Sequence, residues 1–333
     1  MCAYPGAAGS SADHRRLPEP RSHPMPLDPD AQAIADAVSQ MPALHEMGLD
    51  GAREFTALAD FPAETEIADV HEITVPTPGG NLTARLYHPN PHALLPILLY
   101  MHGGGWATGG LWTADETCRK LAAQASCVVV NLDYRLAPEH KFPVPFEDAY
   151  NTALWLSEHG AEIGGDPTRL ALGGDSAGAT LSAAVAVHAR DNDGPAITAL
   201  LLAYPATEYA VERPSWIENA DAPMLCTKDV LWFWDIYLRD DADRTDPRAT
   251  PSNSESLAGL PPAFVLTAET DPLRDDAESF GAALQDAGNH VVAKRYPGVF
   301  HGFFTMPMLT RSKTAIADAA RFLSRRFAQR PPV

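Results

Sequence analysis

The sequence predicts an α/β fold with a mostly parallel central sheet flanked by helices, and two patterns in the 333 residues support this prediction. From about residue 70 onward, short apolar runs alternate with stretches of helical spacing, which is typical of strand–helix–strand units. Several of these runs, such as "PILLYMH" (96–102), are almost continuously apolar. Continuous runs of this kind indicate strands that are buried on both faces of a parallel sheet.

The expected elements follow one another in a regular order along the chain. Strands are expected at "HEITVP" (71–76), "LTARLYHP" (82–89), "PILLYMH" (96–102), "CVVVNLDY" (127–134), "RLALGG" (169–174), "ITALLLAYP" (197–205), "PAFVLTAE" (262–269) and "HVVAKRYP" (290–297). Helices are expected over 113–125, 146–159, 177–190, 273–287 and 312–328. No helix separates the first two strands, so we expect an antiparallel start to the sheet.

Three segments fall outside this alternation. Residues 25–60 show helical apolar spacing at Ile34 and Val38, and residues 207–245 are rich in Trp and Leu. We expect these two segments to form a helical cap within a single catalytic domain, 25–333. Residues 1–24 are rich in Pro, Ser, Gly and Ala and lack the apolar core of a secretory signal, so we expect a disordered tail, with Met25 as the natural start.

Charge and hydropathy narrow the classes of partner. The formal net charge is −18, which disfavours a nucleic-acid partner because phosphate would be repelled. No apolar run reaches the roughly 18 residues that a membrane span requires. We therefore expect neither a nucleic-acid partner nor a membrane span.

The cysteines and histidines show no familiar metal-binding spacing. The cysteines are Cys2, Cys118, Cys127 and Cys226. They form no CxxC pair, so free thiols in a reducing, cytoplasmic compartment are expected. "HEMG" at His45 and "HEIT" at His71 each lack the second histidine of H-E-x-x-H, with Leu49 and Val75 in its place. The sequence therefore predicts no metal site.

One serine lies in a run of small residues between a predicted strand and a predicted helix. "GDSAG" (174–178) matches G-x-S-x-G, in which Ser176 is a nucleophile on a sharp strand-to-helix turn. Side chains two residues before and after it would clash where strand and helix approach, so glycine is expected at 174 and 178. The alternative is a glycine-rich turn without chemistry.

A nucleophilic serine needs a base and an acid that orients it. Catalytic groups in open parallel sheets lie at the carboxyl ends of strands. His301 directly follows the last predicted strand, whereas His290 stands at its other end, so His301 is the expected base. Asp271 follows the preceding strand and is the expected acid, with Glu269 as its nearest rival; the alternative role for Asp271 is a helix cap.

The loop "HGGGW" (102–106) also follows a predicted strand. The backbone N–H groups of Gly103, Gly104 and Gly105 are expected to stabilise a developing oxyanion together with the N–H of Ala177. A nucleotide-binding loop is the alternative, but Thr108 occupies the third glycine position of G-x-G-x-x-G.

As a set, these motifs resemble the hormone-sensitive-lipase-like branch (family IV) of the α/β-hydrolases. The matching segments are "HGGGW" (102–106), "DYRLAPEHKFPVPFEDAY" (133–150), "GDSAG" (174–178), "DPLRDD" (271–276) and "HGF" (301–303). The resemblance implies an α/β-hydrolase fold with a helical cap. It also implies a cofactor-free carboxylesterase for short-to-medium acyl chains, with Ser176, Asp271 and His301 as its triad, and a homodimer, because the family often dimerises.

Two other functions use the same residues or the same fold. An amidase or N-acetyl hydrolase would need the same triad, and a non-catalytic small-molecule receptor would need only the fold. Trp106, beside the glycine loop, and Tyr204, at a strand end, are the expected substrate contacts.

Overall fold

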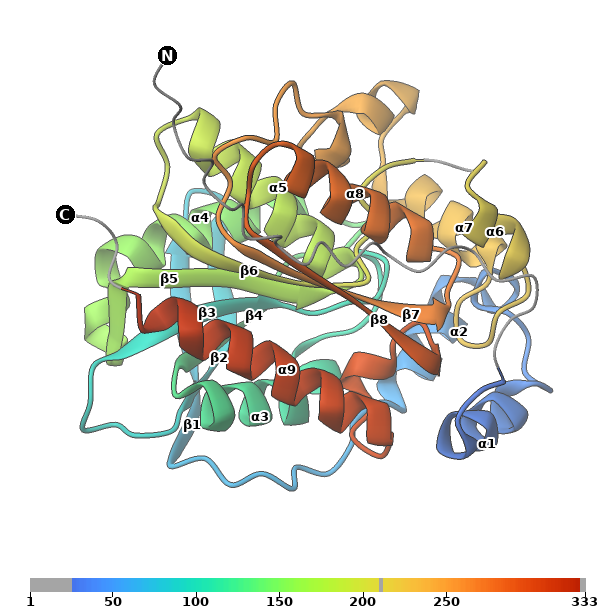
Figure 1. The fold of residues 1–333 in the computed structure, drawn as a ribbon, viewed down its shortest axis with the longest axis horizontal. Coiled ribbons are helices and arrows are strands. Elements are labelled where there is room, and N and C mark those ends of the chain that lie inside the picture. The colour runs from blue at the N-terminus through green and yellow to red at the C-terminus, as the bar shows by residue number, and fades with distance from the viewer. Residues whose placement is uncertain (1–25, 210–211, 330–333) are drawn as a thin grey trace, which may run out of the picture.

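A computed structural model describes residues 26–209 and 212–329, in which a single eight-stranded sheet lies between two layers of helices (Figure 1). The expectation for residues 1–24 concerns a segment outside the described residues. The strands are β1 (Asp69–Thr77), β2 (Gly80–His88), β3 (Leu95–Met101), β4 (Val128–Asp133), β5 (Gly165–Asp175), β6 (Ile197–Ala203), β7 (Ala263–Thr270) and β8 (Val291–Phe300). Each predicted strand is present.

The order of the strands in the sheet is β1-β2-β4-β3-β5-β6-β7-β8. β2 pairs antiparallel with both β1 and β4, and all other neighbours are parallel. The expected antiparallel start and the parallel remainder are both confirmed. The parallel strands therefore bring their carboxyl ends to one edge of the sheet.

Helices cover both faces of the sheet, which explains the apolar strand sequences. The helices that flank the sheet are α3 (Asp115–Ala125), α4 (Val144–His159), α5 (Ala177–Asp191), α8 (Arg274–Asp286) and α9 (Thr310–Phe327). Successive β3 residues point to opposite faces: Leu98 and Tyr100 belong to the core under α3 and α9, and Leu99 and Met101 to the core under α4, α5 and α8 (Figure 1). All four side chains are fully buried.

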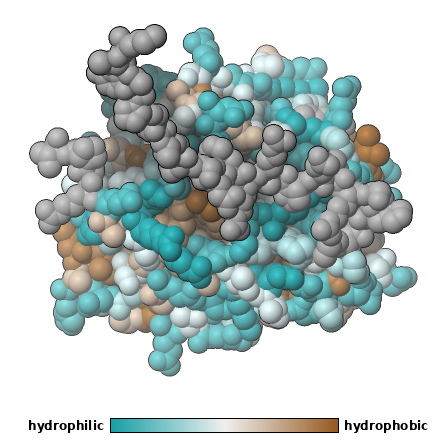
Figure 2. Space-filling model, viewed as in Figure 1, coloured by the Kyte–Doolittle hydropathy of each residue, from teal (hydrophilic) through white to brown (hydrophobic). Residues whose placement is uncertain are grey.

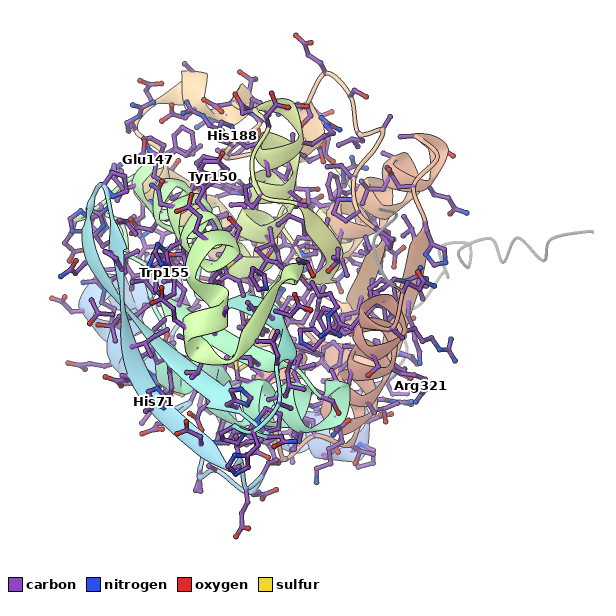
Figure 3. The ribbon with its side chains drawn as sticks, turned by 90° about the vertical axis from the view of Figure 1, so that its left-hand side faces the viewer. His71, Glu147, Tyr150, Trp155, His188 and Arg321 are labelled. Atoms are coloured by element: carbon purple, nitrogen blue, oxygen red, sulfur yellow. The ribbon has the colours of Figure 1, made fainter. Side chains whose placement is uncertain are left out.

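The α4 and α5 helices are fixed to each other by aromatic contacts. Tyr150 on α4 and His188 on α5 meet edge to face with ring centroids 4.7 Å apart, and both lie on the face turned to the viewer in Figure 3. Edge-to-face geometry of this kind stabilises aromatic pairs beyond their buried area. The packing holds α5, whose first residue follows Ser176.

The two segments expected to form a cap contain four further helices. These are α1 (Pro29–Val38), α2 (Leu44–Ala57), α6 (Pro214–Glu218) and α7 (Thr227–Tyr237). They lie at the end of the sheet to which the arrows of β7 and β8 point (Figure 1). That these helices form a cap distinct from the rest of the domain stays a prediction.

The surface is rich in polar side chains, in keeping with a highly charged chain. Figure 2 shows a face that is mostly hydrophilic, with small hydrophobic patches. Within the described parts of the chain, no helix combines the length and apolarity needed to cross a membrane.

Candidate active site

Ser176 lies on a strained turn between β5 and α5. Its φ of +52° is in the left-handed region, which non-glycine residues rarely adopt. A Cβ atom at Gly174 or at Gly178 would overlap the carbonyl oxygen of Met101 on β3. The glycines two residues before and after the serine are thus required by the close approach of β3, as the sequence predicted.

The three residues predicted as a triad form one continuous chain of hydrogen bonds. His301 Nε2 lies 2.9 Å from Ser176 Oγ, and His301 Nδ1 lies 2.8 Å from Asp271 Oδ2. With the carboxylate at Nδ1, the imidazole carries its proton there and leaves Nε2 free to accept the serine hydroxyl. The residues come from the carboxyl ends of β5, β7 and β8.

Buried neighbours hold Asp271 and His301 in place. Asp271 is fully buried, and its Oδ1 accepts a hydrogen bond from the Leu273 N–H at 2.8 Å. Asn219 Nδ2 donates to the Asp271 carbonyl at 3.1 Å. Tyr204 lies against the imidazole of His301, with ring centroids 4.5 Å apart. The N-cap of α8 is Leu273, so the Leu273 contact closes a turn before that helix and Asp271 does not occupy the cap position considered for it.

The rival residues lie away from this chain of contacts. His290 is exposed at the amino end of β8, where its ring contacts Arg326 at 3.1 Å. Glu269 lies within β7, two residues before Asp271.

The glycine loop after β3 supplies two of the three free N–H groups at the serine. In the described residues, the N–H groups of Gly104, Gly105 and Ala177 have no hydrogen-bond acceptor, and all three residues line the cavity that contains Ser176. The Gly103 N–H instead donates to Asp175 Oδ1 at 3.2 Å. Gly103 was expected among the oxyanion donors; its N–H is used to anchor the loop.

The cavity above Ser176 has a volume of ≈ 320 Å³ and a mainly apolar wall. The wall includes Ile34, Leu44, Phe55, Leu58, Met224, Leu225, Val230, Phe233 and Met308, contributed by both predicted cap segments and by the loop after His301. Trp106 also lines it. Tyr204 is fully buried beneath His301 and is not part of this wall, so the geometry gives it a packing position and not the expected substrate contact.

Known proteins match most of this chain in sequence. A family profile described as the alpha/beta hydrolase fold matches residues 98–305. Esterase LipI of Mycobacterium tuberculosis is 39% identical over 284 residues, which make up 83% of this chain and 88% of that protein. The chain belongs to the α/β-hydrolase family. The resemblance to its hormone-sensitive-lipase-like branch is confirmed.

Other members of the α/β-hydrolase family support the same placement. Carboxylesterase NlhH of Mycobacterium tuberculosis is 44% identical over 219 residues, 65% of this chain and 68% of that protein. The solved structure of a hyperthermophilic esterase from the archaeon Pyrobaculum calidifontis has a TM-score of 0.84 at 35% identity, and the match covers 90% of this chain and 99% of that one.

Asp175 is a site residue that the sequence analysis missed, because it occupies a variable position of G-x-S-x-G. Its Oδ1 accepts hydrogen bonds from Tyr100 Oη at 2.7 Å and from the Gly103 N–H at 3.2 Å. Burial raises the pKa of Asp175 to about 6, against the partly opposing effects of the Tyr100 hydrogen bond and the charge of His301. This carboxyl group therefore connects the serine turn to the glycine loop.

The Asp175→Asn variant is expected to change how stability depends on pH. The raised pKa means that the protonated carboxyl stabilises the fold fully below about pH 4, and this contribution is lost as the pH rises through about 6. Asn stays neutral, so relative to the unmodified chain the variant should gain up to about 3 kcal/mol in free energy of unfolding between pH 4 and 7. Urea unfolding across this pH range measures the difference.

Asp166→Asn is the matched control at the other end of β5. Burial alone would raise the pKa of Asp166, but hydrogen bonds from Thr168 and Arg169 lower it. This variant should therefore lose stability relative to the unmodified chain as the pH rises. Parallel pH profiles for Asp175→Asn and the unmodified chain would show that Asp175 is not held protonated.

Proposed function

We propose that the chain hydrolyses carboxylic esters through an acyl-enzyme intermediate, with Ser176 as nucleophile, His301 as base and Asp271 as the acid that orients it. The observation that carries this proposal is the unbroken contact from Ser176 Oγ to His301 to Asp271, at 2.9 and 2.8 Å. The esterase names of the relatives fit the same chemistry. The chain is therefore an ester hydrolase of the serine type.

The geometry supports a two-step reaction. Ser176 Oγ attacks the ester carbonyl carbon while His301 Nε2 takes the hydroxyl proton. The carbon–oxygen bond to the alcohol then breaks, and His301 returns the proton to the departing alcohol. A water molecule next attacks the acyl-serine by the same proton path, which frees the carboxylic acid and restores Ser176.

The proposed oxyanion position of each tetrahedral intermediate lies between the glycine loop and the start of α5. The proposed donors are the free N–H groups of Gly104, Gly105 and Ala177. Each such donor typically contributes about 10²–10³ in rate. The amino end of α5 adds a partial positive charge on the same side.

The cavity supports short-to-medium acyl groups. Its volume of ≈ 320 Å³ is near the lower limit of the range of about 300–1,000 Å³ for small-molecule sites. Its apolar wall would favour an alkyl chain over a charged group. A long chain would have to leave the cavity between the helices that enclose it.

Hydrolysis rates on p-nitrophenyl esters with two to sixteen acyl carbons test this proposal. We expect kcat/KM to be greatest for short or medium chains and to fall for the longest chains, because the wall limits length. A rate that keeps rising to sixteen carbons would contradict the proposed acyl range while leaving the triad intact. No turnover of any ester would favour the receptor alternative.

Matched anilides test the amidase alternative. The same acyl groups presented as p-nitroanilides should be hydrolysed more slowly than the esters.

A homodimer and a cytoplasmic location stay predictions.

A further inference from the structure

A cluster of three potential metal ligands lies beside the active-site cavity, where the two predicted cap segments meet. His45 is on α2, Cys226 directly precedes α7, and Asp229 lies in the first turn of α7. Their donor atoms, one nitrogen, one sulfur and one oxygen, all lie within 4.8 Å of one another. We propose that His45, Cys226 and Asp229 bind a divalent transition-metal ion, with Zn²⁺ as the best-fitting ion.

The distances between donor atoms are close to those around tetrahedral zinc. His45 Nδ1 lies 2.7 Å from Asp229 Oδ1 and 4.0 Å from Cys226 Sγ. Zinc bonds of about 2.0–2.3 Å at tetrahedral angles would place such donors about 3.4–3.6 Å apart. To reach these separations, the nitrogen–oxygen pair would have to open and the nitrogen–sulfur pair to close, each by less than about 1 Å.

The surrounding charges favour a cation. The three residues line a second cavity with a volume of ≈ 530 Å³. Its other charged side chains are the acids Asp36, Glu46 and Asp221 and one base, Lys228. The cavity leaves room for a water molecule as the fourth ligand, the arrangement of an open zinc site.

The backbone already holds the carboxylate in position. Asp229 accepts hydrogen bonds from the backbone N–H groups of His45 at 2.9 Å and Cys226 at 3.0 Å. These two backbone contacts explain why an acid is needed at 229, but neither involves the Cys226 thiol or the His45 imidazole. Cys226 is the N-cap residue of α7 and forms a capping box with Asp229, a position that Ser, Thr, Asp or Asn ordinarily occupies.

A bound ion would connect two distant parts of the chain. His45 and Cys226 are 181 residues apart. The local pattern "HEMG" therefore contains only one of the proposed ligands, His45. Leu44, Phe55, Met224 and Leu225 line both this cavity and the cavity above Ser176. Metal binding would therefore hold together the wall that encloses the acyl group. The proposal does not depend on the ester chemistry.

Co²⁺ titration of the full, chelator-treated chain tests the site, because a cobalt–thiolate bond gives a near-ultraviolet charge-transfer band. Cys2→Ser serves as the background so that the Cys2 thiol does not contribute; the other two cysteines, Cys118 and Cys127, are fully buried. We expect one equivalent of Co²⁺ to produce the band, with release of the thiol proton. One equivalent of Zn²⁺ should then displace Co²⁺ and remove the band. Cys226→Ser should abolish the band, and His45→Gln and Asp229→Asn should each weaken affinity by about tenfold or more.

His71→Gln is the matched control. His71 contacts Asp69 at 3.0 Å on β1, without a cysteine, and lies on the face shown in Figure 3. Its replacement should leave the band and the affinity unchanged. Absence of a thiolate band, or equal affinity in the His45→Gln and His71→Gln variants, would overturn the proposal.

A second measurement avoids substitutions within the cluster. Zn²⁺ should slow alkylation of Cys226 in the Cys2→Ser chain by about tenfold or more, as read by peptide mass spectrometry, because coordination ties up the thiolate. Equal alkylation with and without Zn²⁺ would also overturn the proposal, whatever the folding of the variants.

Discussion

Ser176→Ala is expected to lower kcat on a short p-nitrophenyl ester by about 10⁵–10⁶-fold, as loss of a catalytic serine does in other triads. Ser176 Oγ is the atom that His301 Nε2 contacts at 2.9 Å, and no other hydroxyl shares that contact among the described residues. The remaining rate would come from water held near the glycine loop. Pre-steady-state kinetics should also lose the burst that an acyl-enzyme produces.

Ser182→Ala is the control for this substitution. Ser182 is a buried serine on α5, the helix that follows Ser176, and its Oγ donates to the Gly178 carbonyl at 2.9 Å, away from His301. It should keep its activity. Adding His301→Ala to Ser176→Ala should cause little further loss, because the two residues act as one unit. A Ser176→Ala enzyme within about tenfold of the unmodified rate would remove Ser176 as nucleophile.

The fold was predictable because its signals are local. Apolar runs such as 96–102 and 127–134 are buried on both faces, and that burial is visible in the sequence itself. The ends of strands were less predictable: β8 continues to Phe300, three residues past its predicted end, and β5 begins at Gly165. The extra residues are fixed by pairing with neighbouring strands, and a single run does not reveal that pairing.

The proposed triad was predictable for a similar reason. Ser176, Asp271 and His301 each follow a recognisable strand, and parallel strands bring their carboxyl ends together. The rest of the site depends on packing between distant segments. Asp175 takes the Gly103 N–H because β5 lies beside β3, and Tyr204 lies beneath His301 because of a backbone turn with a φ of +39°. The pairing of His45 with Asp229 has no local signal either.

Asp271→Asn is expected to lower kcat by about 10⁴-fold, with a much smaller effect on KM, because it changes the position of one proton. The Asn oxygen can still accept from the Leu273 N–H, which leaves its amide N–H₂ facing His301 Nδ1. The imidazole would then carry its proton on Nε2 and could not accept the hydroxyl proton of Ser176. Steady-state kinetics of the purified variant measures this loss.

Asp275→Asn separates this effect from the general loss of an acid near the site. Asp275 accepts a hydrogen bond from the Ser215 N–H at 2.9 Å and makes an ion pair with Arg274, so its replacement should spare kcat. An unchanged kcat in Asp271→Asn would instead remove Asp271 as the orienting acid. Since Asp271→Asn preserves the shape of the side chain, a large loss would identify control of the imidazole tautomer, and not the packing of Asp271, as what this residue contributes.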